Sequence, residues 1–179
     1  MLVMRNLFFV LLIGISPMLL NAKPSTTDNV PAELNNVKNQ LMLVGKAKFS
    51  VLFWDIYDSA LFSASGDYQA QNAYLFEITY LREISKADLI ERTVEQWQHI
   101  GVPENAYAPY LEQLEQLWPN INKGDQLAMW FNGTSTAFYF NQKLQGQIDS
   151  PEFSEMFVNI WLSPQTSQPK LRKKLLGKR

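Results

Sequence analysis

The 179-residue chain contains no cysteine. This absence excludes disulfide bonds, thiol catalysis and cysteine-ligated metal sites. Small secreted domains of eukaryotes usually carry disulfides, so an exported chain without them fits a bacterial periplasm better.

Histidine is nearly absent as well, since His99 is the single one in the chain. A metal site with two histidines is therefore excluded, and a Ser-His-Asp triad would depend on His99 alone. His99 precedes Gly101 at the end of a predicted helix, where the helix dipole favours it, so we interpret it as structural. The chain also lacks the GxxxxGK[ST], GxGxxG and GxSxG patterns. We expect no cofactor and no metal.

Long apolar runs are absent after the N-terminus, where Leu7 to Leu20 follow the charged Arg5. With the small Ala22 at its end, this layout predicts a signal peptide over residues 1–22 and a periplasmic location. The run is short and contains Pro17, which disfavours a membrane-spanning helix, although an uncleaved N-terminal anchor is the alternative. Residues 23–39 are polar and predict a flexible N-terminal segment. Residues 40–179 then form a single domain with a basic C-terminal tail.

Acidic and basic residues are unevenly distributed. Residues 169–179 hold six basic residues and no acidic one, whereas residues 23–168 hold nine basic and seventeen acidic residues. An acidic body argues against a nucleic acid partner. The basic tail is interpreted as a solvated helix end, with a peripheral contact to anionic lipid headgroups as the alternative.

The order of predicted elements indicates the fold class. The segment from Gln40 to Phe62 predicts a short and a long strand divided at Gly45, and residues 73–81 predict a third. Ser85 is expected to cap a helix that ends before Gly101, and a second amphipathic helix ends before Pro119. An Asn-Gly turn within residues 126–140 predicts a hairpin, followed by a short strand at 144–148 and helices from Pro151 and Pro169. This order predicts an α+β fold: an antiparallel β-sheet with helices packed on one face.

Two carboxylates interrupt the apolar stretch FWDIYDSALF. The period-two alternation of a strand places Asp55 and Asp58 on opposite faces. They therefore do not form a paired carboxylate site, and we expect both to serve the sheet.

Aromatic residues are abundant, with five Trp, seven Tyr and eleven Phe. Most are expected in the core, and some are expected to line a cleft for an apolar ligand. Tyr80 and Arg82 lie two apart at a strand end and would together hold a carboxylate. Alternatively, Arg82 pairs with an exposed acid such as Glu83 or Asp88. Trp97 is either a core residue or a ligand contact.

Several segments resemble the bacterial chalcone isomerase-like family. These are GKAKFSVLFWDIYDSALF, LWPNINKGDQL, YFNQKLQGQIDSPEFSEMFVNIWL and PKLRKKLLG, which together span about residues 40–177. The resemblance implies a large antiparallel sheet with helices against one face and a ligand cleft between them. The wider superfamily contains plant enzymes that close a flavonoid ring, plastid proteins that bind fatty acids, and exported bacterial members of unassigned function.

The resemblance also shows where this chain departs from the plant enzymes. The arginine that these enzymes share with the fatty-acid binders falls at Ala47, beside Lys46 and Lys48. Their catalytic threonine falls near Trp54 or Asp55, and their catalytic tyrosine falls within Ser85 to Leu89, which contains no tyrosine. A lysine replaces the positive charge but not the bidentate geometry of an arginine.

These observations predict an exported, non-catalytic protein that binds a small amphipathic or fatty-acid-like ligand between sheet and helices. The cleft would be lined by Trp54, Tyr80 and Trp97, with Lys48 or Arg82 as the anchor for the acid group. Two alternatives stay open: an isomerase or lyase with an unknown periplasmic substrate, and an envelope interaction domain that uses the basic tail. The sequence does not determine the oligomeric state.

Overall fold

The computed structural model describes residues 33 to 178. The predicted signal peptide and residues 23–32 of the predicted flexible segment lie outside the described residues. Among residues 33 to 178, no helix combines the length and apolar character that crossing a membrane needs.

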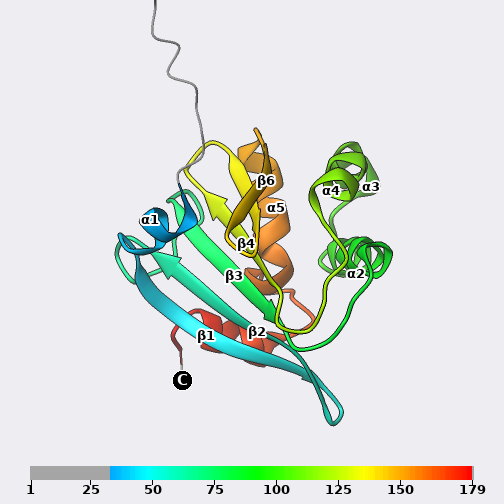
Figure 1. The fold of residues 1–179 in the computed structure, drawn as a ribbon, viewed down its shortest axis with the longest axis horizontal. Helices are drawn as coiled ribbons and strands as arrows, with labels where there is room; N and C mark the ends of the chain where they lie inside the picture. Colours follow the sequence, from blue (N-terminus) through cyan, green and yellow to red (C-terminus); the bar gives the residue numbers. More distant parts are fainter. Residues whose placement is uncertain (1–32, 179) are drawn as a thin grey trace, which may run out of the picture. The chain divides into compact units, whose positions relative to one another are not determined.

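A six-stranded antiparallel sheet forms the centre of the domain, with the strands in chain order from β1 to β6 (Figure 1). Its strands are β1 (Met42–Val51), β2 (Trp54–Ser63), β3 (Tyr74–Tyr80), β4 (Gln126–Phe131), β5 (Thr136–Phe140) and β6 (Lys143–Ile148). Neighbours in the sheet are consecutive strands of the chain. Residues 81–125 join β3 to β4, and the other connections are short. The sheet was predicted from its hairpin signals, and the α+β class is confirmed.

Helices cover one face of this sheet. They are α2 (Lys86–His99), α3 (Glu104–Tyr107), a 3-10 turn (Ala108–Tyr110), α4 (Leu111–Leu117), α5 (Pro151–Leu162) and α6 (Pro169–Leu175). Trp97 of α2 and Phe153 and Phe157 of α5 meet in one aromatic cluster, with ring centroids 5.6 to 6.5 Å apart. Phe157 in turn contacts Phe138 of β5 at 5.6 Å, which joins the helices to the sheet.

A short helix, α1 (Leu34–Lys38), lies against the opposite face of the sheet (Figure 1). Its Leu34 packs with Leu75, Ala128 and Tyr139 in a second apolar cluster. Lys38 forms an ion pair with the buried Glu77, at 2.6 Å between Nζ and Oε2. The prediction of a flexible segment over residues 23–39 is therefore corrected at residues 34–38, which the sheet holds in place.

Gly45 does not divide two strands as the sequence suggested, because β1 runs through it. A Cβ atom at Gly45 would lie 2.1 Å from the carbonyl oxygen of Lys174 in α6. The glycine therefore serves the close approach of a helix rather than a turn. The turn lies instead at Leu52 and Phe53, where the sequence has no Gly, Pro or Asn.

The basic tail is a packed helix over most of its length, which corrects the expected solvated helix end. Leu171 and Leu175 are buried, and Arg172 Nε donates a hydrogen bond to the carbonyl oxygen of Leu162 at 2.7 Å. The charged groups of Lys173 and Lys174 lie at exposed positions. Deleting residues 170–179 would thus remove part of the core along with the charge.

Candidate functional site

A β-bulge in β2 determines which side chains face the helices. Phe49 is opposite Tyr57, but Ser50 is opposite Asp55, so Ile56 is an extra residue on this strand. A bulge breaks the period-two alternation because two successive residues oppose one. Consequently Ile56 and Tyr57 both border the cavity described below.

The same bulge brings the two aspartates to one face of the sheet. Lys48 Nζ lies 2.8 Å from Asp55 Oδ2 and 3.9 Å from Asp58 Oδ1. Lys48 and Ser50 donate hydrogen bonds to Asp55 and hold the pKa of its carboxyl below the usual value. The prediction that Asp55 and Asp58 point to opposite faces is wrong, since strict alternation was assumed across the bulge. All three charged groups are about half exposed, so their mutual attraction is weak.

A cavity of about 760 Å³ lies between the sheet and helices α2 and α5. This volume falls within the range of small-molecule binding sites. Its inner wall is apolar and comes from the central strands and α5. The residues of this wall are Phe76, Ile78, Leu127, Met129, Phe138, Phe157 and Ile160.

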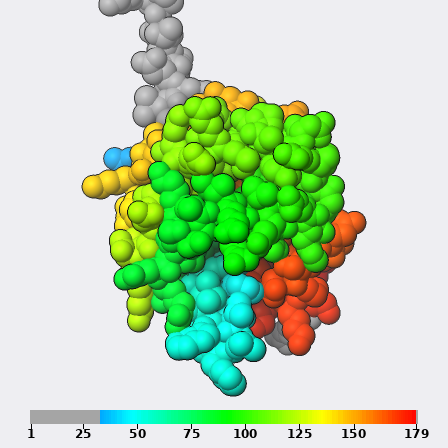
Figure 2. Space-filling view, turned by 90° about the vertical axis from the view of Figure 1, so that its right-hand side faces the viewer, coloured from blue at the N-terminus to red at the C-terminus, as the bar shows by residue number. Residues whose placement is uncertain are grey.

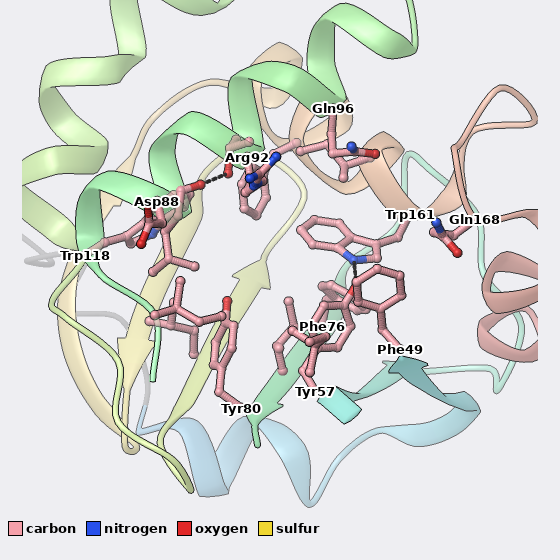
Figure 3. A pocket seen from close by; sticks show the side chains of 18 of the residues that line it. Phe49, Tyr57, Phe76, Tyr80, Asp88, Arg92, Gln96, Trp118, Trp161 and Gln168 are labelled. Carbon is pink, nitrogen blue, oxygen red and sulfur yellow. Dashed lines mark hydrogen bonds between the residues drawn. The ribbon is translucent and has the colours of Figure 1, made fainter. Parts of the chain in front are cut away.

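Aromatic contacts fix one side of the cavity (Figure 3). Trp161 of α5 donates a hydrogen bond from Nε1 to the Tyr57 hydroxyl at 2.9 Å. Its ring lies 4.9 Å from that of Phe76, and the Tyr57 ring lies 5.1 Å from that of Phe49. Strands β1, β2 and β3 are thereby joined to α5 by side chains whose positions are mutually constrained, so this wall exists before any ligand enters.

Tyr80 provides a polar group on the side of the cavity opposite Trp161 and Tyr57. It is buried, and Figure 3 shows its hydroxyl directed from β3 toward α2. Within residues 33 to 178 its hydroxyl has no hydrogen-bond partner. Burial, with a smaller contribution from Tyr57, raises the pKa of Tyr80 above the usual value. A neutral phenol is a donor and acceptor for a ligand, but not a base near neutral pH.

Charged side chains surround the opening of the cavity. Arg92 of α2 pairs with Glu95, at 2.6 Å between Nη1 and Oε2. Arg82 instead lies over the indole ring of Trp54, 4.0 Å from the ring centroid. No carboxylate of the described residues forms a salt bridge with Arg82, and the expected alternative of a pair with Glu83 or Asp88 is not present there. Arg82 is thus a guanidinium whose hydrogen-bond donors are available at the opening.

The structure brings together three of the five residues expected in the cleft. Trp54, Tyr80 and Arg82 all line this cavity. Lys48 lies outside it, on the other face of the sheet, in a polar hollow of about 520 Å³ that also contains Lys46 and Glu77.

Trp97 also lies outside the cavity lining, in the core. It is fully buried, stacks on Tyr107 at 5.3 Å, and donates a hydrogen bond to the Met156 carbonyl oxygen at 3.1 Å. Its indole N–H is therefore occupied within the protein.

Sequence reasoning missed the contribution of α2 and α5. Leu89, Arg92, Thr93 and Gln96 of α2 line the cavity, and so does Trp161 of α5. The four α2 residues are spaced three to four apart, which places them on one face of the helix. This spacing is the sequence signal that could have identified them. That signal does not distinguish a face packed in the core from one that borders a cavity.

Among residues 33 to 178 there is no group of three or more His, Asp or Glu placed to hold a metal ion. The titratable groups that line the cavity are the phenols inside and the charged side chains at its opening. The arrangement is suited to enclosing an apolar chain and holding a polar group near the opening.

Comparison with proteins of known structure supports the fold. The domain resembles the crystal structure of the Arabidopsis thaliana fatty-acid binding protein AtFAP1, with a TM-score of 0.61 and 10% sequence identity. The similarity covers 77% of this chain and 87% of that one.

Sequence comparison extends the similarity to bacteria. An uncharacterized protein of Haemophilus influenzae is 21% identical over 136 residues, which is 75% of this chain and 67% of the relative. Residues 25–177 match the family described as chalcone isomerase-like. The match spans the whole sheet and all the helices that cover it, so the chain belongs to the chalcone isomerase-like family.

Proposed function

We propose that this protein is a non-catalytic member of its family that binds a small amphipathic ligand, such as a long-chain fatty acid, in the cavity between the sheet and helices α2 and α5. The observation that carries the proposal is an apolar cavity with an arginine at its opening that has no carboxylate partner in the described residues. The hydrocarbon chain lies against the apolar wall, and the acid group lies beside Arg82.

Arg82 suits this role better than the other cations near the site. The guanidinium of Arg92 is paired with Glu95, and Lys48 contacts two aspartates on the other face of the sheet. A guanidinium binds a carboxylate through two parallel hydrogen bonds, and stacking on Trp54 restrains it beforehand. The ligand carboxylate thus gains a partner without breaking an existing ion pair.

The comparisons and the sequence support the same proposal. The similar solved structure is described as a fatty-acid binding protein. In this chain the positions that resemble the plant enzymes' catalytic threonine and tyrosine hold Trp54 or Asp55 and the segment Ser85 to Leu89. The phenols inside the cavity have raised pKa values, which disfavours the phenolate that base catalysis would require.

Calorimetric titration of the delipidated protein with a long-chain fatty acid tests the proposal. We expect a dissociation constant in the micromolar range, about −8 kcal/mol. Arg82→Gln is expected to weaken the fatty acid roughly tenfold while changing the affinity for the alcohol of equal chain length little, because only the acid carries a charge. Arg92→Gln is the matched control, and Arg82→Lys should recover part of the loss.

Absence of binding at about 100 µM acid would contradict the proposal. Equal losses for acid and alcohol in Arg82→Gln would keep the cavity as the site but remove Arg82 as the anchor. A larger loss in Arg92→Gln than in Arg82→Gln would assign the anchor to α2 instead.

The proposal includes export to the periplasm. It is supported by Arg5, the apolar run that follows it and the small Ala22. Mass spectrometry of the chain recovered from the periplasmic fraction tests this, since cleavage after Ala22 leaves residues 23–179.

A further inference from the structure

The turn between β1 and β2 exposes large apolar side chains at its tip. Leu52 is 87% and Phe53 97% exposed, and the flanking Val51 and Trp54 are about half exposed. Figure 2 shows the β1–β2 hairpin (cyan) projecting beyond the helices at the lower end of the molecule. We call residues Val51 to Trp54 the apolar tip. Large apolar residues are seldom this exposed together in a short turn without a function.

The backbone of the apolar tip also departs from what a stable turn favours. Leu52 has a φ of 55°, in the left-handed region. Two-residue hairpin turns with positive φ normally use Asn, Asp or Gly there. A leucine at this position costs stability and forms no core contact in return. Local rules are expected to be broken where function requires it.

The apolar tip adjoins the cavity. Val51 and Trp54 both line the cavity opening, and Arg82 lies over Trp54. The surface that continues outward from the cavity opening is therefore Leu52 and Phe53. A surface that Leu52 and Phe53 penetrate therefore lies next to the cavity opening.

The shape and size of the apolar tip restrict what it contacts. Two protruding side chains bury on the order of 400 Å² at most, well below the roughly 1,000 Å² of a specific protein interface. A convex apolar projection also fits no flat protein surface. A lipid bilayer accepts such a projection without a preformed pocket, and tryptophan and arginine behind the tip match the chemistry of its headgroup region.

We propose that the apolar tip inserts into the surface of a phospholipid membrane and brings the cavity opening against it. Leu52 and Phe53 enter the acyl boundary, Trp54 and Arg82 lie at the headgroup level, and the cavity exchanges its amphipathic ligand with the bilayer. The inference extends the proposed function by naming where the ligand is taken up.

The charges beside the apolar tip indicate whether insertion requires anionic lipids. Lys48 pairs with Asp55 and Asp58, and Glu83 lies beside Arg82 in the sequence. This neighbourhood has no excess of positive charge. Insertion therefore rests on apolar burial, and we expect it on zwitterionic phosphatidylcholine with little dependence on salt.

A single label tests the insertion. The chain has no cysteine, so the Phe53→Cys variant takes up an environment-sensitive fluorophore at one site. The labelled protein is the form recovered from its host after any N-terminal cleavage. With phosphatidylcholine vesicles, we expect a blue shift at residue 53 and quenching by lipids that carry a quencher in the acyl region. Leu144→Cys on β6, at the other edge of the sheet, is the control position and is expected to stay in water.

Unlabelled variants measure the contribution of the apolar tip. Leu52→Asn with Phe53→Asn is expected to lower vesicle partitioning about tenfold or more, and asparagine tolerates the positive φ, so the fold is kept. Met42→Asn with Leu43→Asn, which replaces two exposed apolar residues at the start of β1, is the matched control and should change partitioning less than about twofold.

A label at residue 53 that stays in water in the presence of vesicles would overturn the inference, even if another segment holds the protein on the membrane. Self-association that the Leu52 and Phe53 substitutions abolish, with no vesicle binding, would assign the apolar tip to a second copy of this chain. None of these measurements uses a fatty acid, so failure here is distinct from failure of the proposed function.

Discussion

Tyr57 shows how a single residue connects the strands to the helices. Its hydroxyl accepts the hydrogen bond from Trp161, and its ring contacts Phe49 and lies 6.1 Å from that of Tyr80. Burial raises the pKa of Tyr57 to about 12, and the hydrogen bond from Trp161 opposes this only in part. The phenol must therefore stay neutral for the wall of the cavity to keep its packing.

We expect stability to depend on alkaline pH through this group. In the unfolded chain a tyrosine ionises near pH 10, so the neutral phenol stabilises the fold fully below about pH 10. This contribution is lost as the pH rises toward about 12, the folded value. Urea unfolding at about pH 8 and about pH 11 should show a smaller decrease for Tyr57→Phe than for the wild type, each relative to its own value at the lower pH. Equal decreases in the two proteins would contradict this assignment.

At the scale of residues, the sequence predicted part of the cavity lining. Tyr80 and Arg82 were expected to act together because they lie two apart at a strand end, and both line the cavity. Lys48 was assigned by its position beside Ala47 in the family resemblance, but in the strand it faces away from the helices. Trp97 was assigned by residue type, which does not distinguish a core indole from one at a site.

At the scale of elements, α6 depends on a glycine more than one hundred residues away in the sequence. A side chain at Gly45 would approach the carbonyl oxygens of Lys174 and Leu175 within 2.1 and 2.6 Å. Main-chain atoms of a helix do not move aside as a flexible side chain does. The sheet and α6 therefore pack backbone against backbone at this position.

Gly45→Ala tests this packing. We expect a loss of roughly 1 to 3 kcal/mol in the free energy of unfolding, because the added methyl group displaces α6 from β1. Urea unfolding measures the loss, and limited proteolysis should cut the chain earlier near Ser163 to Pro169. Lys46→Ala, the exposed neighbour on the same strand, is the control and should change stability little. An unchanged stability in Gly45→Ala would show that α6 adjusts freely.

Elements with local signals were predicted, and those fixed by distant contacts were not. Ser85 caps α2 by accepting a hydrogen bond from the Asp88 amide, and Pro151 opens α5, as their sequences indicate. The Asn132-Gly133 turn joins β4 and β5 as expected. In contrast, Gly45 was interpreted as a strand break because its partner lies in α6. The true turn was missed because Leu52 and Phe53 carry no turn signal.

At the scale of the whole molecule, the proposed function makes the cavity a compromise between stability and binding. A volume of about 760 Å³ between sheet and helices deprives many apolar side chains of packing partners. A closer packing of α2 and α5 against the sheet would increase stability and leave no room for a ligand. The presence of the cavity in a core this rich in aromatic rings is what the proposed binding function requires.

Thr93→Leu shifts this compromise toward stability. Thr93 lies on the cavity side of α2, and its hydroxyl donates a hydrogen bond to the Leu89 carbonyl oxygen of the same helix. Leucine is the better helix former and fills part of the cavity with apolar atoms, so we expect a gain of about 1 kcal/mol in the free energy of unfolding. The same atoms occupy space that the ligand needs, so long-chain acids should bind about tenfold more weakly. The affinity for shorter acids should decrease less.

Thr93→Val separates the two causes, because it removes the hydroxyl without filling the cavity. Urea unfolding and acid titration of both variants provide the measurement. If Thr93→Leu gains stability and keeps its affinity for long-chain acids, the chain of the ligand does not pass this face of α2. If Thr93→Val weakens binding as much as Thr93→Leu does, the hydroxyl rather than the volume determines affinity. If Thr93→Leu gains stability and loses affinity while Thr93→Val does neither, the added volume is the cause. The ligand then occupies the space that the core leaves unfilled.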